Sequence, residues 1–364
     1  MNSIFKKIAV FFLSAVFICA AAGCNSIGEN SGGKGDASET GKIKFNKVYY
    51  DYFDTVSTIV GYEETQEEFD KKCEYISAEL ERYNMLYDIY HKYSGINNIC
   101  TLNSEAANGP VEVDKDVIAL LKFSMEMYET TFGKTNVAMG KVLSIWHTYR
   151  ENGNYDPANA ALPPMDELKE AAEHCNINDV VIDEENNTVF FKDPLLKLDV
   201  GSVAKGYSTE RIALDLIEMG AENYALNIGG NIRTTGPKGD GTSWSAGIQN
   251  PDMASDKTFL LKVLVDNKTL VTSGDYQRYY YVDGVKYHHI IDAETLMPKN
   301  DFTSVSILSE NSGMADALST ACFNLSLEEG MKLINSLENT EAMWVAFDGT
   351  EYFSDHFLDY ELKE

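Results

Sequence analysis

Two glycine-rich segments decide the fold of this chain: LDVGSVAKG at residues 198–206 and NIGGNIRTTG at 227–236. The apolar alternation over 196–200 predicts a buried strand that ends near Asp199 and then breaks into a helix with Lys205 in its first turn. Glycines at such a corner let the backbone approach a ligand closely, and the free amides of a helix start favour an anion. The segments therefore predict a turn that handles phosphate.

Neither of the two common nucleotide-binding motifs is present. The chain has no GxxxxGK[ST] loop, and no GxGxxG follows a predicted strand. Lys205 has a plain alternative role as a solvated helix residue. Taken alone, the segment leaves the phosphate site as one of two interpretations.

The N-terminus has the pattern of a bacterial export signal. A short basic region at Lys6 and Lys7 precedes an apolar stretch over 8–22, and small residues precede Cys24. We predict a lipoprotein signal peptide over 1–23, with Cys24 as the lipid-bearing residue; a secretory signal with an incidental cysteine is the alternative.

Residues 24–42 are rich in small and polar side chains and predict a flexible tether. We therefore expect one folded domain over 43–364. It would lie on the extracytoplasmic face of the cell membrane, held there by the lipid anchor only.

The chain is strongly acidic, with 30 Lys and Arg against 57 Asp and Glu among 364 residues and a formal net charge of −27. Such a surface argues against nucleic acid and anionic lipid as partners. An anionic ligand needs a local cation here, either a lysine or a metal ion.

The cysteines beyond the predicted anchor are widely separated and show no CxxC spacing, which argues against a zinc site. We expect four buried thiols, with two disulfides as the alternative in an exported chain. These cysteines are Cys73, Cys100, Cys175 and Cys322.

The mixture of helical and alternating patterns predicts an α+β fold with mainly antiparallel sheets. The strongest hairpin signal is Asp283-Gly284, between strands over 276–282 and 285–291. A second hairpin is expected over 180–191 and a single strand over 48–62. Helices are predicted over 67–86, 117–132, 137–149, 163–174, 314–325 and 327–337.

Asp316 and Thr320 stand four residues apart in a predicted helix, so their oxygens point the same way. A carboxylate and a hydroxyl suit Mg²⁺, which keeps waters and substrate phosphates as further ligands. The alternative is an acidic residue near a helix start together with a packed threonine.

A pair of adjacent histidines precedes the predicted helix that carries Asp316 and Thr320. Ser273 and Asp275 precede the predicted hairpin, His288 and His289 lie near the end of its second strand, and Asp292 follows it. An imidazole beside a phosphate site can act as a general base. Adjacent residues of a strand point to opposite faces, so at most one of the two histidines serves a given site.

Taken together, these segments resemble the bacterial flavin transferases of the ApbE family, the FAD:protein FMN transferases. DTVSTI at 54–59 is similar to an early strand of the family, and Tyr93, ten residues before Asn103, stands where the family places a tyrosine. Further matching blocks are LDVGSVAKGY (198–207), NIGGNIRTTG (227–236), WSAGIQNP (244–251), SGDYQRYYYVDGVKYHHIID (273–292) and MADALSTA (314–321). Asn231 stands where many members have aspartate.

The resemblance implies a T-fold-related domain that binds FAD with Mg²⁺. It also implies transfer of FMN to a threonine hydroxyl of exported redox proteins, with release of AMP. The implied metal ligands are Asp316, Thr320 and the Ser202 carbonyl. The implied catalytic residues are His289 as base, Asp292 beside it and Lys205 at the pyrophosphate. The implied cofactor-binding residues are Tyr93 at the isoalloxazine and Asp199, Lys205, Asn227, Gly229, Gly230, Asn231, Ser273, Asp275 and His289.

Two other functions remain open from the sequence. One is hydrolysis of FAD to FMN and AMP at the same site, with water in place of threonine. The other is flavin binding without turnover by a surface lipoprotein.

Overall fold

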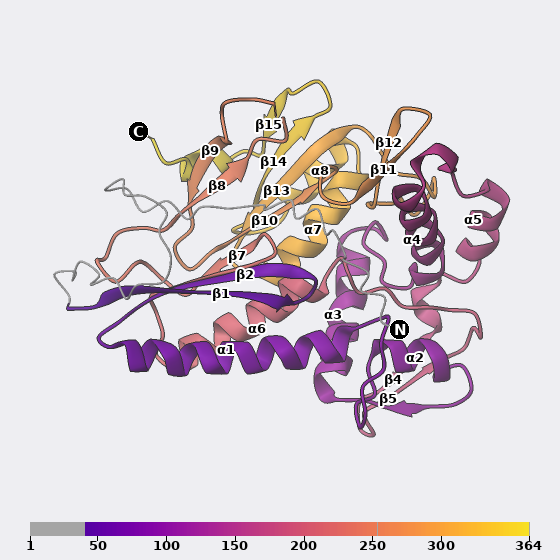
Figure 1. The fold of residues 1–364 in the computed structure, drawn as a ribbon, viewed down its shortest axis with the longest axis horizontal. Coiled ribbons are helices and arrows are strands. Elements are labelled where there is room, and N and C mark those ends of the chain that lie inside the picture. Colours follow the sequence, from indigo (N-terminus) through magenta and orange to yellow (C-terminus); the bar gives the residue numbers. More distant parts are fainter. Residues whose placement is uncertain (1–40, 253, 364) are drawn as a thin grey trace, which may run out of the picture.

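The computed structural model describes residues 41–252 and 254–363. Its centre is an eight-stranded sheet in which every neighbouring pair of strands is antiparallel (Figure 1). The strands, in their order across the sheet, are β1 (Ile43–Tyr52), β2 (Thr55–Glu63), β6 (Tyr224–Ile228), β7 (Asn231–Thr234), β10 (Thr269–Gly274), β13 (Phe302–Ser309), β14 (Glu341–Ala346) and β15 (Glu351–Phe353). The predicted α+β class with antiparallel sheets is confirmed.

Three smaller antiparallel sheets and a set of helices surround the central sheet. The small sheets are β3 (Val111–Glu112) with β5 (Thr188–Phe191) and β4 (Val180–Asp183), β8 (Ser245–Gln249) with β9 (Phe259–Leu264), and β11 (Tyr279–Val282) with β12 (Val285–His288). The helices are α1 (Gln66–Tyr87), α2 (Ile99–Glu105), α3 (Lys115–Thr130), α4 (Gly140–Tyr155), α5 (Met165–Ala172), α6 (Ala204–Glu218), α7 (Ser312–Asn324) and α8 (Leu327–Asn335).

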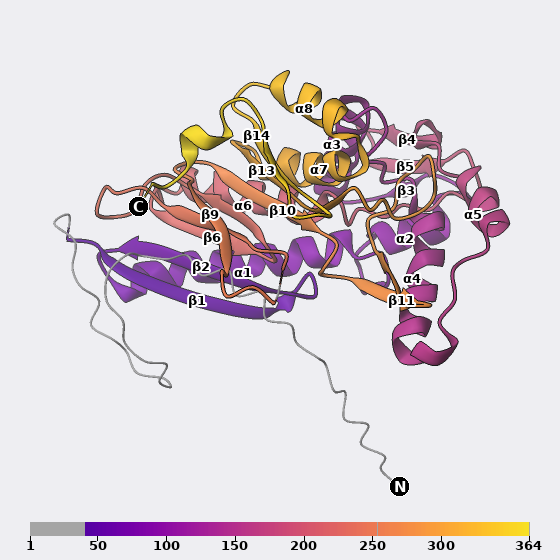
Figure 2. The same ribbon diagram turned by 90° about the horizontal axis from the view of Figure 1, so that it is seen from above.

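The two faces of the central sheet are both buried, which follows from the alternation of apolar residues along its strands. On β2, Ile59 packs toward the helical core around α1 and α6, and Val60 packs toward the β8–β9 pair. On β13, Ile307 faces α7 and α8, and Leu308 faces the opposite side. Figure 1 and Figure 2 show α4 and α5 beyond the end of this sheet, where they share a core cluster with β11 and β12.

The predicted strand over 48–62 is wrong in one respect, because the segment is the β1–β2 hairpin. Phe53 and Asp54 form its turn with φ of 53° and 51°. Two consecutive positive φ values give a type I′ geometry, whose twist suits a hairpin. Asp54-Thr55 therefore lies at the tip of a hairpin, next to the pocket described below.

The predicted strand over 196–200 does not form. The Asn103 side chain makes the two hydrogen bonds to Leu198 that a neighbouring strand would otherwise make. Leu198 N donates to Asn103 Oδ1 at 2.7 Å, and Asn103 Nδ2 donates to the Leu198 carbonyl at 2.9 Å. Asp199 N donates to the Val137 carbonyl at 2.8 Å. Side-chain amides compete with sheet pairing in this way, so the segment stays extended and well bonded without belonging to a sheet. The helix predicted from residue 137 accordingly begins only at Gly140.

The two predicted hairpins at 180–191 and around Asp283-Gly284 are confirmed. All four cysteines of the described residues are free; Cys73 and Cys322 are buried, whereas Cys100 and Cys175 are only half-buried. In residues 41–252 and 254–363 no helix is long and apolar enough to cross a membrane. The predicted signal peptide, Cys24 and nearly all of the tether lie outside the described residues.

Candidate active site

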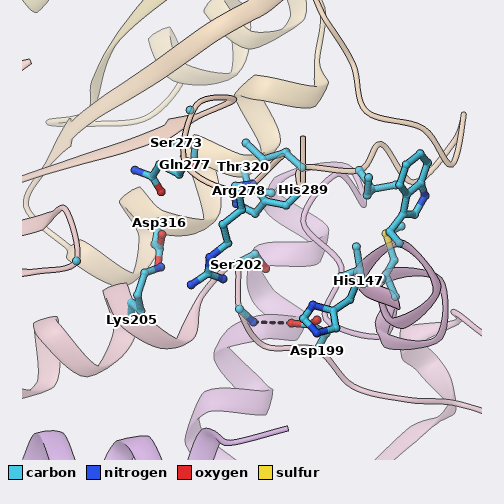
Figure 3. A pocket seen from close by; sticks show the side chains of 18 of the residues that line it. His147, Asp199, Ser202, Lys205, Ser273, Gln277, Arg278, His289, Asp316 and Thr320 are labelled. Carbon is cyan, nitrogen blue, oxygen red and sulfur yellow. Dashed lines mark hydrogen bonds and ion pairs between the residues drawn. The ribbon is translucent and has the colours of Figure 1, made fainter. Parts of the chain in front are cut away.

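A pocket of about 220 Å³ collects residues from segments that are far apart in the sequence (Figure 3). It lies where α6, α7 and α4 meet the β6–β7 turn and the end of β10. Of the residues predicted for the site, the pocket is lined by Asp199, Ser202, Lys205, Gly229, Asn231, Ser273, His289, Asp316 and Thr320.

The inner wall of the pocket is the corner where α6 packs on α7. A Cβ on Gly206 would lie 2.3 Å from the Ser312 carbonyl oxygen and 2.5 Å from Asp316 Cβ. Only glycine allows the two helices to come this close. The close approach lets Gly206 N donate a 2.8 Å hydrogen bond to Asp316 Oδ2.

The buried Asp316 carboxylate uses one oxygen for contacts within the protein. Besides Gly206 N, Asp316 Oδ2 accepts a hydrogen bond from Asn231 Nδ2 at 3.1 Å and lies 3.8 Å from Lys205 Nζ. No hydrogen bond from the described residues reaches Asp316 Oδ1 or the Thr320 hydroxyl. One carboxylate oxygen and one hydroxyl are thus left to a ligand in the pocket.

The Ser202 carbonyl lies just before the hydrogen-bonded part of α6, which begins at Ala204. In a continuous helix Gly206 N would donate to this carbonyl, but here it donates to Asp316. Among the described residues no cluster of three His, Cys, Asp or Glu side chains forms a metal site. A hard cation at this corner would need hydroxyl, carbonyl, water and substrate oxygens, and these are the ligands Mg²⁺ takes.

The β6–β7 turn supplies Gly229 and Asn231 to the pocket. Gly229 and Gly230 have φ of 58° and 95°, so they close a two-residue hairpin that favours glycine. Asn227 Oδ1 accepts from Gly230 N at 3.0 Å and braces the turn. Asn227 and Gly230 themselves do not line the pocket.

His289 lines the pocket, and His288 does not. His288 is buried against the Phe323 ring, and its Nε2 lies 2.9 Å from the Lys299 carbonyl. His289 Nδ1 is buried without a hydrogen-bond partner among the described residues. Burial, and after it the nearby Arg278 and Arg150, lower the pKa of His289 well below its usual value. This imidazole is therefore neutral at pH 7 and able to accept a proton.

Three further predicted site residues do not line the pocket, and each has a polar partner; Lys134, the partner of Asp292, does line it. Asp275 forms a 2.5 Å ion pair with Lys286, and Asp292 one of 3.2 Å with Lys134. The Tyr93 hydroxyl donates to Asp88 at 2.8 Å.

Tyr90, three residues before Tyr93, is the tyrosine of this loop that lines the pocket. The Asp88 carboxylate fixes the loop by accepting hydrogen bonds from Tyr90 N at 2.6 Å and from His91 N at 3.0 Å, in addition to the Tyr93 hydroxyl.

The outer wall of the pocket was missed by sequence reasoning. It consists of Tyr90, of His147 and Arg150 on α4, and of Gln277 and Arg278 in the turn between β10 and β11. Arg278 had one signal in the sequence: it is a basic residue in a strongly acidic chain, and it lies between Ser273 and His289, which were both predicted for the site.

Asp199 faces this outer wall (Figure 3). Burial raises the pKa of the Asp199 carboxyl, and the Gly201 amide, Arg278, His147 and Arg150 oppose that shift. Asp199 Oδ1 accepts a 2.9 Å hydrogen bond from Gly201 N.

The model of the ApbE family matches residues 53–344, which is most of the chain. The chain belongs to the ApbE family. The ApbE relatives include the FAD:protein FMN transferase of Treponema pallidum, 35% identical over 261 residues that cover 68% of this chain and 70% of that protein. They also include the FAD:protein FMN transferase of Vibrio cholerae, 30% identical over 294 residues that cover 78% and 83%.

Solved ApbE structures share the fold. The ApbE protein of Thermotoga maritima superposes with a TM-score of 0.76 at 28% identity and covers 88% of this chain and 100% of that one. The flavin transferase ApbE from Vibrio cholerae gives a TM-score of 0.72 at 24% identity, covering 88% and 99%; this likeness supports the fold alone. The curated relatives are enzymes, so the pocket is a candidate active site.

Proposed function

We propose that this chain is an FAD:protein FMN transferase. It would transfer the FMN half of FAD to a threonine hydroxyl of exported acceptor proteins, in a Mg²⁺-dependent reaction that releases AMP. The observation that carries the proposal is the α6–α7 corner, where Asp316, Thr320 and Lys205 line the same pocket as His289. The names of the relatives support the flavin chemistry.

The donor set at the corner fits a magnesium ion. Asp316 Oδ1, the Thr320 hydroxyl and the Ser202 carbonyl would hold it, and it would neutralise charge on the diphosphate of FAD. Asn231 contributes by donating to Asp316 Oδ2, which an aspartate at this position could not do. Lys205, beside Asp316, would bind a phosphate oxygen.

His289 would accept the proton of the threonine hydroxyl as that oxygen attacks phosphorus. Its lowered pKa keeps it neutral before the reaction, as a general base must be. Tyr90 at the rim would contact the flat isoalloxazine ring. FAD and the threonine hydroxyl would give a phosphodiester between threonine and FMN, and the other products would be AMP and a proton.

The test is direct. The full chain is incubated with FAD, Mg²⁺ and an acceptor protein, and the denatured acceptor is examined for flavin fluorescence. Covalently labelled acceptor together with AMP, both abolished by a chelator, supports the proposal. AMP and FMN without labelled acceptor indicate FAD hydrolysis, and FAD binding without products indicates a binding protein; either result overturns it.

We further propose that the protein is an exported lipoprotein anchored through Cys24, on the sequence pattern of residues 1–24. Metabolic labelling with a fatty acid tests this. Label in the wild-type chain and none in Cys24→Ser supports the anchor, and equal label in both contradicts it.

A further inference from the structure

Two guanidinium groups line the active-site pocket without a carboxylate partner. Arg278 makes no hydrogen bond or ion pair with the described residues. Arg150 makes one, with His147 Nδ1 at 2.7 Å. Arg150 is half-buried and Arg278 is exposed, and both line the same space.

Two arginines outside the pocket are paired with carboxylates. Arg233 is buried and paired with Glu210 through two hydrogen bonds of 3.0 and 3.1 Å. Arg82 is 2.9 Å from Glu79 and 2.6 Å from Asp116. Arg211 on α6 also has no carboxylate partner among the described residues, but it is exposed and lies outside the pocket. What sets Arg150 and Arg278 apart is that two such groups share one pocket.

The charges of Arg150 and Arg278 also affect each other. After burial, the charge of Arg278 is the largest cause that lowers the pKa of Arg150. The pKa of His147 is lowered by burial and by Arg150, so this imidazole is neutral and accepts a hydrogen bond instead of adding charge. Glu151 and Asp199 act in the opposite direction and raise the pKa of Arg150. Neither carboxylate forms an ion pair with Arg150 or Arg278 among the described residues, so a bound anion would lower the electrostatic cost of holding the two cations together.

The position of Arg278 indicates which anion this is. In Figure 3 its side chain extends into the pocket, between Asp316 and Lys205 on one side and His147 and Asp199 on the other. Both arginines also line an adjoining groove of about 550 Å³, formed with Asp54, Glu151, Asn154 and Tyr279. The Arg278 guanidinium thus lies between the α6–α7 corner and the adjoining groove. The groove is large enough for another part of the substrate.

The chemistry of the proposed function requires a cation at this position. The diphosphate of FAD carries two negative charges, whereas the products carry three, one on the FMN phosphodiester and two on AMP, with one proton released. The additional charge develops on the leaving AMP phosphate. Lys205 is already close to Asp316, so a further cation is needed on the leaving side.

We propose that Arg278, with Arg150 beside it, binds the leaving AMP phosphate and stabilises the charge that develops there. This inference rests on the proposed function. A guanidinium suits the role because its planar fork matches two phosphate oxygens and stays charged at every working pH. The bond that breaks joins the bridging oxygen to the FMN phosphorus, and its electron pair leaves with AMP onto the oxygen that the arginines face.

The experiment uses the full chain and three variants: Arg278→Gln, Arg278→Lys and the matched control Arg211→Gln. Arg211 is exposed on α6 and does not line the pocket, and its replacement makes the same change in net charge. Melting curves of all four proteins check the fold.

The first measurement is AMP binding by equilibrium dialysis, which needs no turnover. We expect Arg278→Gln to weaken AMP binding by on the order of tenfold or more, Arg278→Lys to weaken it less, and Arg211→Gln to leave it unchanged. Equal AMP affinity in all four proteins overturns the proposal.

The second measurement is transfer kinetics. We expect kcat to fall by roughly 100-fold in Arg278→Gln, with a smaller change in KM for the acceptor. A raised KM for the acceptor with unchanged AMP binding would mean that Arg278 contacts a carboxylate of the acceptor, and this also overturns the proposal. If the wild-type chain labels no acceptor, the proposed function fails, whereas the dialysis result still decides the AMP site.

Discussion

The two walls of the pocket differ in how far the protein satisfies its own polar groups. At the inner wall, α6 and α7 touch through Gly206, and Asp316 has three nitrogen neighbours on one oxygen. At the outer wall, Arg278 has no polar partner among the described residues, and Arg150 has only His147. The inner wall is thus completed by contacts within the fold, and we expect a ligand to complete the outer wall.

This comparison predicts different consequences for changes at the two walls. Changes at the inner wall should abolish chemistry or destabilise the fold. Changes at the outer wall should alter substrate binding and pH dependence and leave the fold intact.

The largest effect is expected for Asp316→Asn. The amide oxygen can still accept from Gly206 N, but the negative charge that attracts a divalent cation is lost. FMN transfer should fall by roughly 10³-fold, with an unchanged melting temperature. The matched control is Asp166→Asn in the exposed first turn of α5, which should retain wild-type activity; wild-type turnover by Asp316→Asn contradicts the metal assignment.

The next effect concerns stability behind the inner wall. Glu210 accepts from Arg233 and also from Ser312 N at 2.7 Å, so it joins α6, β7 and the start of α7. Glu210→Ala leaves a buried arginine unpaired and should lower the free energy of unfolding by about 3–5 kcal/mol.

Urea unfolding measures this change. The comparison variant Glu79→Ala removes one of the partners of the half-exposed Arg82 and should cost less than about 1 kcal/mol. Similar losses in the two variants would show that the Glu210 pair is not special.

The pH dependence of kcat/KM tests His289. Because its pKa is lowered, the imidazole remains neutral as the pH falls through its usual value of about 6.5. The acid limb of the profile should therefore lie below pH 6.5. Arg278→Gln removes a nearby cation, raises the pKa and should move the limb to higher pH. A wild-type limb at or above pH 6.5 contradicts His289 as the base.

The smallest effect is expected at the rim. Tyr90→Ala should raise KM for FAD by roughly threefold to tenfold through loss of a ring contact, with little change in kcat. Tyr93→Phe, which removes only the hydroxyl bonded to Asp88, should change KM less. A larger rise in KM for Tyr93→Phe than for Tyr90→Ala would mean that Tyr93, and not Tyr90, contacts the flavin.

The pairing of Asp316 with Thr320 could be predicted from the sequence because its geometry is local. Their spacing on one helix follows from helix periodicity alone, whereas the part of the Ser202 carbonyl was implied by the resemblance to the ApbE family. The hairpins at 180–191 and around Asp283-Gly284 followed from their turn residues in the same way, whereas the turn at Phe53-Asp54 gave no such signal.

The outer wall could not be predicted, because distant contacts place it. The Asn103 amide replaces a strand partner of Leu198, so residues 196–200 form no strand despite their alternation. The Asp88 carboxylate bonds Tyr93 and shapes the loop so that Tyr90 lines the pocket. Arg150 and Arg278 line the same pocket because α4 packs beside the turn between β10 and β11. The spacing of residues in the sequence does not predict this packing.

The central claim is that one pocket holds a divalent cation at the inner wall and the FAD diphosphate between Lys205 and Arg278. A crystal structure with FAD and Mn²⁺, with the metal located by its anomalous scattering, tests this most directly. The account predicts Mn²⁺ bound to Asp316 Oδ1 and the Thr320 hydroxyl, with phosphate oxygens reaching Lys205 and Arg278. A metal peak away from the α6–α7 corner, or a diphosphate outside this pocket, would contradict it.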